Sequence, residues 1–241
     1  MTDSCRIRYY IPAHDEDVLR EAIESDAEVI IMDLEQNCPS EKKDAGRALV
    51  QRACAEMDFK GSAKWIRVNI VGSAELDEDL KSLERLPDGI VLAQARNGQE
   101  VMTLAAALVD VERRAGVGLN SIPIVPNIES ADGLRNAYEI ASTSARVSEL
   151  GLGGGDMLKD LGGIRTPEGG ELFHVRARLA VEAAAAGVRR IDTVTPVNAS
   201  DEYLERDTRE AFKLGFQGRG TLTTRHIASI RRIWAEMTQG G

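Results

Sequence analysis

Two carboxylates, Glu129 and Asp156, are the residues of this chain whose type and spacing most clearly suggest chemistry. Each follows a short apolar run, and they lie about one strand–helix unit apart, so neighbouring parallel strands would bring them to one edge of a sheet. Two adjacent carboxylates repel each other unless a proton or a cation lies between them. Mg²⁺ accepts two protein oxygens and keeps other positions for water or substrate. The pair therefore predicts a site for a hard divalent cation.

Further polar side chains stand where other apolar runs end. Arg67 offers a fixed, planar positive charge suited to a carboxylate or an enolate oxygen. In a barrel of parallel strands, such residues meet at the carboxyl-terminal rim even though they are scattered in the sequence. The remaining members of this group are Asp33, Glu35, Asn69, Gln94, Arg96 and Asp192.

Each of these residues also has a purely structural interpretation. Glu129 precedes Ser130, which is a plausible N-cap for the next helix. Asp156 follows "GLGGG" and would suit a turn, while Arg67 would suit an interior ion pair. The glycine run alone is weak support for a phosphate loop. None of the three histidines is a convincing base, because His14, His174 and His226 all occur in helix-like contexts.

Eight short apolar runs would have to position these residues. Most are continuously apolar rather than alternating, which is typical of strands covered on both faces. The runs span 8–12, 28–35, 63–69, 89–95, 122–129, 147–154, 189–194 and 215–222.

Helical patterns separate the runs and follow the last one. Ser40 is a plausible N-cap, and Arg113, Arg114 and Gly116 form a helix C-terminal signature. We expect helices over 15–25, 40–57, 77–86, 98–116, 130–143, 171–188, 200–215 and 224–239, and a loop over 162–171. Eight such repeats predict an α/β protein with a (β/α)₈ TIM barrel, occupying 1–241 as a single domain. A doubly wound open sheet is the alternative, but "IPAHDED" after the first run is not a glycine-rich turn.

Composition excludes several classes of function. The net charge of −9 and the lack of a dense block of Lys and Arg argue against nucleic acid or an anionic membrane as a partner. Three cysteines without metal-ligand spacing are expected to be reduced thiols in a cytoplasmic protein. We expect neither a signal peptide nor a membrane span, because no apolar run is long enough.

Several segments together resemble a known family, the HpcH/HpaI aldolases and citrate lyase β subunits, in the citrate-lyase-β-like branch. The matching segments are "IIMDLEQ" (30–36), Lys43 with Arg47, "IRVN" (66–69), "PNIESADGLRNAYEIA" (126–141), "RVSELGLGGGDMLKDLG" (146–162), "AAAAGVRRIDTV" (183–194) and "AFKLGFQGRG" (211–220). They run nearly from end to end of the chain.

The resemblance implies a set of site residues. Glu129 and Asp156 would hold Mg²⁺, and Arg67 would lie beside the metal and bind the substrate carboxylate. Glu35 would order water at the metal, and Arg67, Gly155 and Asp156 would contact the substrate. The resemblance also implies assembly into homotrimers or homohexamers.

The expected activity is that of a Mg²⁺-dependent carbon–carbon lyase or aldolase. Its substrate would be a small oxo- or hydroxy-acid or the CoA thioester of one, cleaved through a metal-stabilised enolate. Alternatives are a malyl-CoA-type condensing enzyme or thioesterase, or a non-catalytic barrel that acts as a ligand sensor or partner subunit.

The chain departs from the family pattern at three places. Gln36 replaces the last acid of Asp-Leu-Glu-Asp, "LAQ" (92–94) lacks the lysine of Leu-Pro-Lys, and "LTT" (222–224) replaces Ile-His-Pro. These departures leave the metal site intact and weaken the expectation of a CoA substrate.

Overall fold

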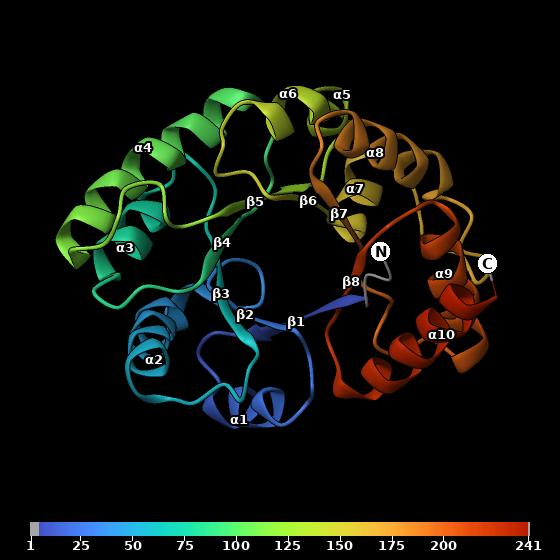
Figure 1. The fold of residues 1–241 in the computed structure, drawn as a ribbon, viewed down its shortest axis with the longest axis horizontal. Helices are drawn as coiled ribbons and strands as arrows, with labels where there is room; N and C mark the ends of the chain where they lie inside the picture. Colours follow the sequence, from blue (N-terminus) through green and yellow to red (C-terminus); the bar gives the residue numbers. More distant parts are fainter. Residues whose placement is uncertain (1–4, 241) are drawn as a thin grey trace.

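The structure, a computed structural model, describes residues 5–240, and these form a closed barrel of eight parallel strands (Figure 1). Each strand pairs with the next one in the sequence, and β1 pairs with β8 to close the barrel. The predicted (β/α)₈ architecture is confirmed, and the open sheet is excluded by this closure. The strands are β1 (Arg6–Pro12), β2 (Val29–Asp33), β3 (Ala63–Val68), β4 (Gly89–Leu92), β5 (Ile124–Ile128), β6 (Glu149–Leu152), β7 (Arg189–Asp192) and β8 (Gly218–Thr221).

Helices surround the barrel, as Figure 1 shows. They are α1 (Glu16–Ile23), α2 (Lys43–Glu56), α3 (Ala74–Ser82), α4 (Gly98–Ala115), α5 (Ala131–Arg135), α6 (Ala137–Ser142), α7 (Gly154–Asp160), α8 (Phe173–Ala185), α9 (Asp201–Lys213) and α10 (Ile227–Gln239), with short 3₁₀ turns η1 (Ser40–Lys42) and η2 (Thr224–His226). No element lies between α7 and α8, as expected for the loop over 162–171. Within the described part of the chain, no helix combines the length and apolar character that a membrane crossing requires.

Three local expectations differ from the structure. Ser40 is not an N-cap, because the chain makes the 3₁₀ turn η1 there before α2 begins at Lys43. The helix expected over 130–143 is divided into α5 and α6 at Asn136. Helix α7 was not predicted, because its glycine-rich first turn was assigned to the end of a strand.

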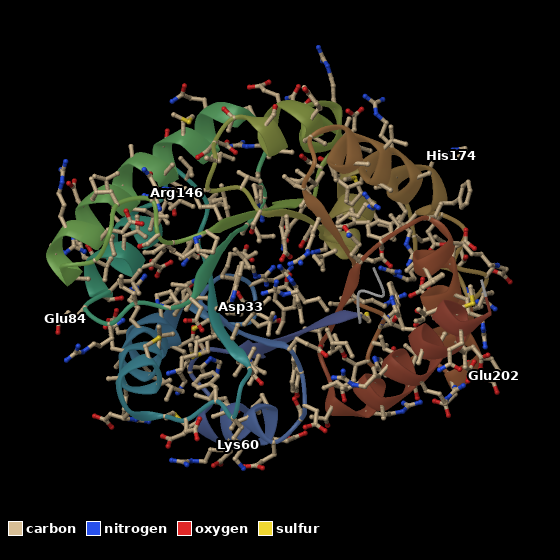
Figure 2. The ribbon with its side chains drawn as sticks, in the orientation of Figure 1. Asp33, Lys60, Glu84, Arg146, His174 and Glu202 are labelled. Carbon is tan, nitrogen blue, oxygen red and sulfur yellow. The ribbon has the colours of Figure 1, made fainter. Side chains whose placement is uncertain are left out.

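The core has two layers. Strand side chains that point outward pack against the helices, whereas Val29, Ile31, Trp65, Val91 and Val125 form a cluster inside the barrel. Side chains of a strand alternate between its two faces, so the next inward residue after Ile31 is Asp33 and the next after Trp65 is Arg67. In Figure 2, Asp33 lies at the centre of the barrel, while Lys60, Glu84 and Glu202 lie at the periphery. The interior is therefore apolar at mid-height and polar towards the carboxyl ends of the strands.

Candidate active site

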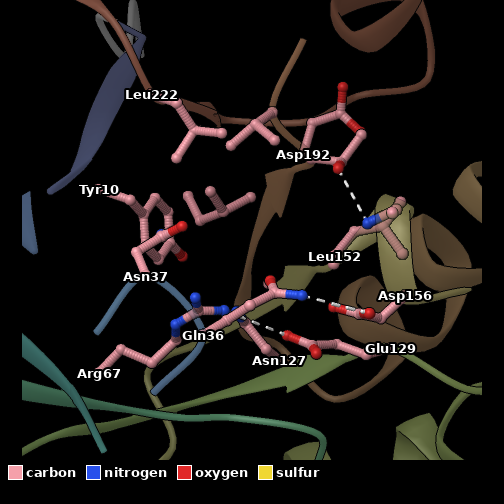
Figure 3. A pocket seen from close by; sticks show the side chains of 18 of the residues that line it. Tyr10, Gln36, Asn37, Arg67, Asn127, Glu129, Leu152, Asp156, Asp192 and Leu222 are labelled. Carbon is pink, nitrogen blue, oxygen red and sulfur yellow. Dashed lines mark hydrogen bonds and ion pairs between the residues drawn. The ribbon is translucent and has the colours of Figure 1, made fainter. Parts of the chain in front are cut away.

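A cavity of about 220 Å³ opens at the carboxyl ends of the strands (Figure 3). Chemistry in barrels of this type occurs at this end. The lining residues are Tyr10, Gln36, Asn37, Arg67, Asn127, Glu129, the segment 151–156, Lys159, the segment 191–194, Gly220 and Leu222. The structure thus brings Arg67, Glu129, Gly155 and Asp156 to one cavity, and Glu35 lies 3.4 Å from Arg67, between its Oε2 and Nη1.

The guanidinium of Arg67 is held in place by Asp33 and Tyr10. Its Nε and Nη2 atoms donate to the two carboxylate oxygens of Asp33 at 2.8 and 2.5 Å, and its guanidinium lies 5.5 Å from the centre of the Tyr10 ring. Nη1 remains on the cavity side, 3.9 Å from Oε1 of Glu129. The carboxylate of Asp33 raises the pKa of Arg67 despite its burial, so this guanidinium is permanently charged. Two of its nitrogens fix its position and the third faces the ligand space.

Glu35 follows β2 in a loop that Lys43 holds in place. The buried Lys43 ammonium donates to the carbonyl oxygens of Leu34 and Glu35 at 2.6 and 3.1 Å and to Oδ1 of Asn69 at 2.8 Å. Burial raises the pKa of Glu35, and the nearby Asp33 and Asp156 add to this effect against the opposing charge of Arg67. The loop therefore presents a partly desolvated carboxylate to the rim.

Glu129 is the least satisfied charge in the site. It is 3% exposed, and neither carboxylate oxygen has a hydrogen-bond partner among residues 5–240. Burial is the main cause that raises its pKa to about 7; Glu35 and Asp156 raise it further, and Arg67 opposes them. A Cβ at position 153 would overlap the Glu129 side chain, so Gly153 is needed for Glu129 to lie against the turn after β6.

Asp156 lies in the first turn of α7, on the same wall of the cavity as Glu129 (Figure 3). Its Oδ1 atom accepts from Nζ of Lys159 at 2.6 Å and from Nε2 of Gln36 at 3.4 Å. An acid at position 36 would repel Asp156, whereas the Gln36 amide donates to it. The turn interpretation of Asp156 is therefore wrong, and the departure at position 36 has a structural consequence.

These carboxylates suit a magnesium ion. Glu129 supplies two buried oxygens without partners, and Asp156 supplies a second, partly exposed carboxylate. Among the described residues, no three His, Cys, Asp or Glu side chains gather closely enough to hold a metal together. Mg²⁺ commonly uses only one or two protein carboxylates and completes its shell with water and substrate. The donor set fits that pattern better than a closed zinc site.

Other residues expected at the rim have different places. Asp192 is among the lining residues, but its carboxylate is occupied by ion pairs with Arg176 and Arg219. Ser130 caps α5 by accepting from the backbone N–H of Gly133 at 3.1 Å, so the capping interpretation of Ser130 holds alongside the position of Glu129 in the cavity. No histidine lines the cavity.

Sequence reasoning gave no role to three residues of the cavity region. Asp33 stands at a strand end in the sequence, but its pairing with Arg67 follows only from the register of β2 with β3. In that register the two residues are direct partners. Asn127 and Lys159 had no signal beyond their nearness to Glu129 and Asp156. The order of inward residues in β5 would have found Asn127, because it lies two positions before Glu129.

The chain matches the family model of HpcH/HpaI aldolase/citrate lyase over residues 6–223. It is 28% identical over 231 residues to the citrate lyase subunit beta of Leuconostoc mesenteroides subsp. cremoris, covering 95% of this chain and 76% of that protein. It is 24% identical over 233 residues to the human mitochondrial citramalyl-CoA lyase, covering 92% and 68% of the two chains.

Solved structures show the same fold. The citrate lyase β subunit of Mycobacterium tuberculosis, complexed with oxaloacetate and magnesium, superimposes with a TM-score of 0.81 at 23% identity, over 97% of this chain and 98% of that one. RipC from Yersinia pestis gives 0.79 at 23% identity, over 98% and 100%. The barrel and its connections are thus shared over nearly the whole length.

Proposed function

Because the chain belongs to the HpcH/HpaI aldolase/citrate lyase family, we propose that it is a Mg²⁺-dependent carbon–carbon lyase. Its substrate is a small oxo- or hydroxy-acid or the CoA thioester of one. The observation that carries this proposal is the Glu129 carboxylate, which is buried without a partner 3.9 Å from the Arg67 guanidinium and on the same wall as Asp156. The names of the relatives support the substrate class, since one is a citrate lyase subunit and another a citramalyl-CoA lyase.

Glu129 and Asp156 would hold the metal. When bound, Mg²⁺ supplies a concentrated positive charge that polarises a substrate oxygen. A cation held by these two residues would also offset the burial and the carboxylate repulsion that raise the pKa of Glu129. Glu35, whose Oε2 lies 3.4 Å from Nη1 of Arg67, would orient water at the metal.

Arg67 would stabilise the charge that develops during cleavage. During cleavage the substrate hydroxyl gives its proton to solvent water, its oxygen becomes a carbonyl oxygen, and the adjacent carbon–carbon bond breaks. The bonding electron pair remains on the departing carbon, next to its carbonyl group, as an enolate. Nη1 of Arg67 is held ready for that oxygen by the Asp33 clamp, so little reorganisation is needed when the charge appears.

We further propose a single lyase domain over 1–241 in a cytoplasmic homotrimer or homohexamer. The support is the family membership and the closed barrel. Light scattering coupled to size exclusion would give the subunit number.

The test is metal binding by calorimetry, together with turnover of a panel of oxo-acids, hydroxy-acids and their CoA esters. We expect Glu129→Gln and Asp156→Asn each to weaken Mg²⁺ binding at least tenfold, because each removes an anionic ligand. Asp132→Asn is the matched control, since Asp132 is an exposed acid at the start of α5. Unchanged affinity in both site variants would show that the metal site is wrongly assigned, and activity without Mg²⁺ would exclude the proposed chemistry.

A further inference from the structure

Asn127 is a cavity residue to which the reaction described above gives no part. It lies on β5 two positions before Glu129 and points into the barrel. Its side chain is buried, with 4% of the residue exposed, and its Oδ1 atom has no hydrogen-bond partner among residues 5–240. A buried acceptor without a donor is costly, and such atoms in a native structure call for a reason.

The place of Asn127 depends on a glycine on the neighbouring strand. Asn127 pairs with Gly151 in the register of β5 with β6, and a Cβ at position 151 would overlap Oδ1 of Asn127. The nearest atom of any other residue, Cγ1 of Val125, is 3.8 Å from that Cβ position. Gly151 therefore makes room for Asn127 and for no other side chain.

The orientation of the Asn127 amide is seen at Gly151. Oδ1 of Asn127 is the atom nearest to the position of a Cβ at 151, so the carbonyl end of the amide lies over this glycine. Asn127 and Gly151 both line the cavity, so the side-chain carbonyl lies at the cavity wall.

We infer that Asn127 is a specificity-determining residue whose Oδ1 accepts a hydrogen bond from the hydroxyl group of a hydroxy-acid substrate. This inference rests on the proposed function and narrows its substrate class. An oxo-acid carries no proton at the corresponding oxygen, so it leaves Oδ1 unpaired. Sites built to pair with a substrate hydroxyl reject the analogue that lacks it for this reason.

The experiment compares malate with oxaloacetate, which differ only in a hydroxyl against an oxo group, by calorimetry in saturating Mg²⁺. Asn127→Ala removes the acceptor, and Asn127→Leu removes it while nearly keeping the side-chain shape. Gly151→Ala displaces the acceptor. The double variant Asn127→Ala/Gly151→Ala tests whether the effect of Gly151→Ala requires the Asn127 side chain. Thermal melting and Mg²⁺ titration of each variant verify that the fold and metal site persist.

We expect either Asn127 variant to weaken malate binding about tenfold and to change oxaloacetate binding less than twofold. Gly151→Ala should have the same effect alone and none in the Asn127→Ala background, because the overlapping atom is then gone. Equal losses of affinity for malate and oxaloacetate would overturn the inference, because a role towards metal-bound water would give that result. Unchanged affinity for both ligands would overturn it too. A wild-type protein that binds no member of the panel of oxo-acids, hydroxy-acids and CoA esters with Mg²⁺ refutes the proposed function itself.

Discussion

At the scale of single residues, the carboxylates of the site are not fully neutralised by the positive side chains around them. Arg67 carries one positive charge and shares it among Asp33, Glu35 and Glu129. Asp33 takes two of its nitrogens, so Glu129 receives only a contact at 3.9 Å. The raised pKa of Glu129 is the electrostatic sign of this shortage. The buried charge of Glu129 is unfavourable without a cation, and this favours metal binding.

Mg²⁺ binding should depend on pH through Glu129. Its pKa of about 7 in the metal-free protein means that a proton competes with the metal below neutrality. We expect Mg²⁺ affinity to rise about tenfold per pH unit below pH 7 and to level off above it. Calorimetry from about pH 5.5 to 8.5, the range in which Glu129 loses its proton, measures how Mg²⁺ affinity changes with pH.

Glu129→Gln provides the control for this pH dependence. Its weaker Mg²⁺ affinity should lack the inflection near pH 7, since the glutamine has no proton to lose. An equally steep profile in the variant would assign the titration to another group.

At the scale of elements, one buried lysine positions the loop that follows β2. Lys43 reaches back from the first residue of α2 to two loop carbonyls and Asn69, and Asn69 in turn donates to Oδ2 of Asp79 at 2.7 Å. Arg47 on the same helix pairs with Asp79. The loop that carries Glu35 and Gln36 is therefore tied to α2 and α3 rather than to the barrel alone.

Lys43→Met should loosen this loop. It leaves two carbonyl oxygens and Oδ1 of Asn69 without their donor, so we expect a loss of about 1–3 kcal/mol in the free energy of unfolding and a fall in kcat. Urea denaturation and steady-state kinetics measure the two effects. Lys42→Met is the matched control, because Lys42 is exposed and should change neither. A stable, fully active Lys43→Met protein would refute the role given to this lysine.

The elements could be predicted from the sequence where burial dictates residue type. All eight strands and most helices follow from apolar runs and periodicity, and Glu129 and Asp156 were placed at the correct rim. Helix α7 was missed because Gly153, Gly154 and Gly155 form its N-cap and the start of its first turn, while its helicity depends on the packing of the buried Met157 and Leu158. The side on which Asp192 lies could not be predicted, because register with the neighbouring strand fixes it and the sequence alone contains no register.

At the scale of the whole molecule, the last repeats are joined by buried charges. Arg176 of α8 pairs with Asp192 at the end of β7 and with Asp207 of α9, and Arg219 of β8 pairs with the same two acids. All four side chains are nearly inaccessible. This cluster links the helix layer to β7 and β8, and β8 closes the barrel against β1.

Removal of one member should destabilise the barrel as a whole. Arg176→Met leaves two buried carboxylates with Arg219 alone, so we expect the free energy of unfolding to fall by about 3–5 kcal/mol. Arg178→Met, two positions along the same helix, is the control, because Arg178 makes only an exposed pair with Glu182. Chemical denaturation compares them, and equal stabilities would show that the cluster does not support closure.

The glycines beside the carboxylates restrict how this cavity can diversify. Side chains at 151 and 153 would overlap Asn127 and Glu129, and one at 154 would crowd Leu172 and Thr193. These glycines cannot be replaced by larger residues without displacing the side chains that pack against them. On the opposite side, where Figure 3 shows Tyr10 and Leu222, the constraint is limited to Gly220, at which a Cβ would overlap Val194. New substrate ranges, in nature or in laboratory evolution, should therefore arise by exchange at Tyr10 and Leu222 while the glycines stay fixed.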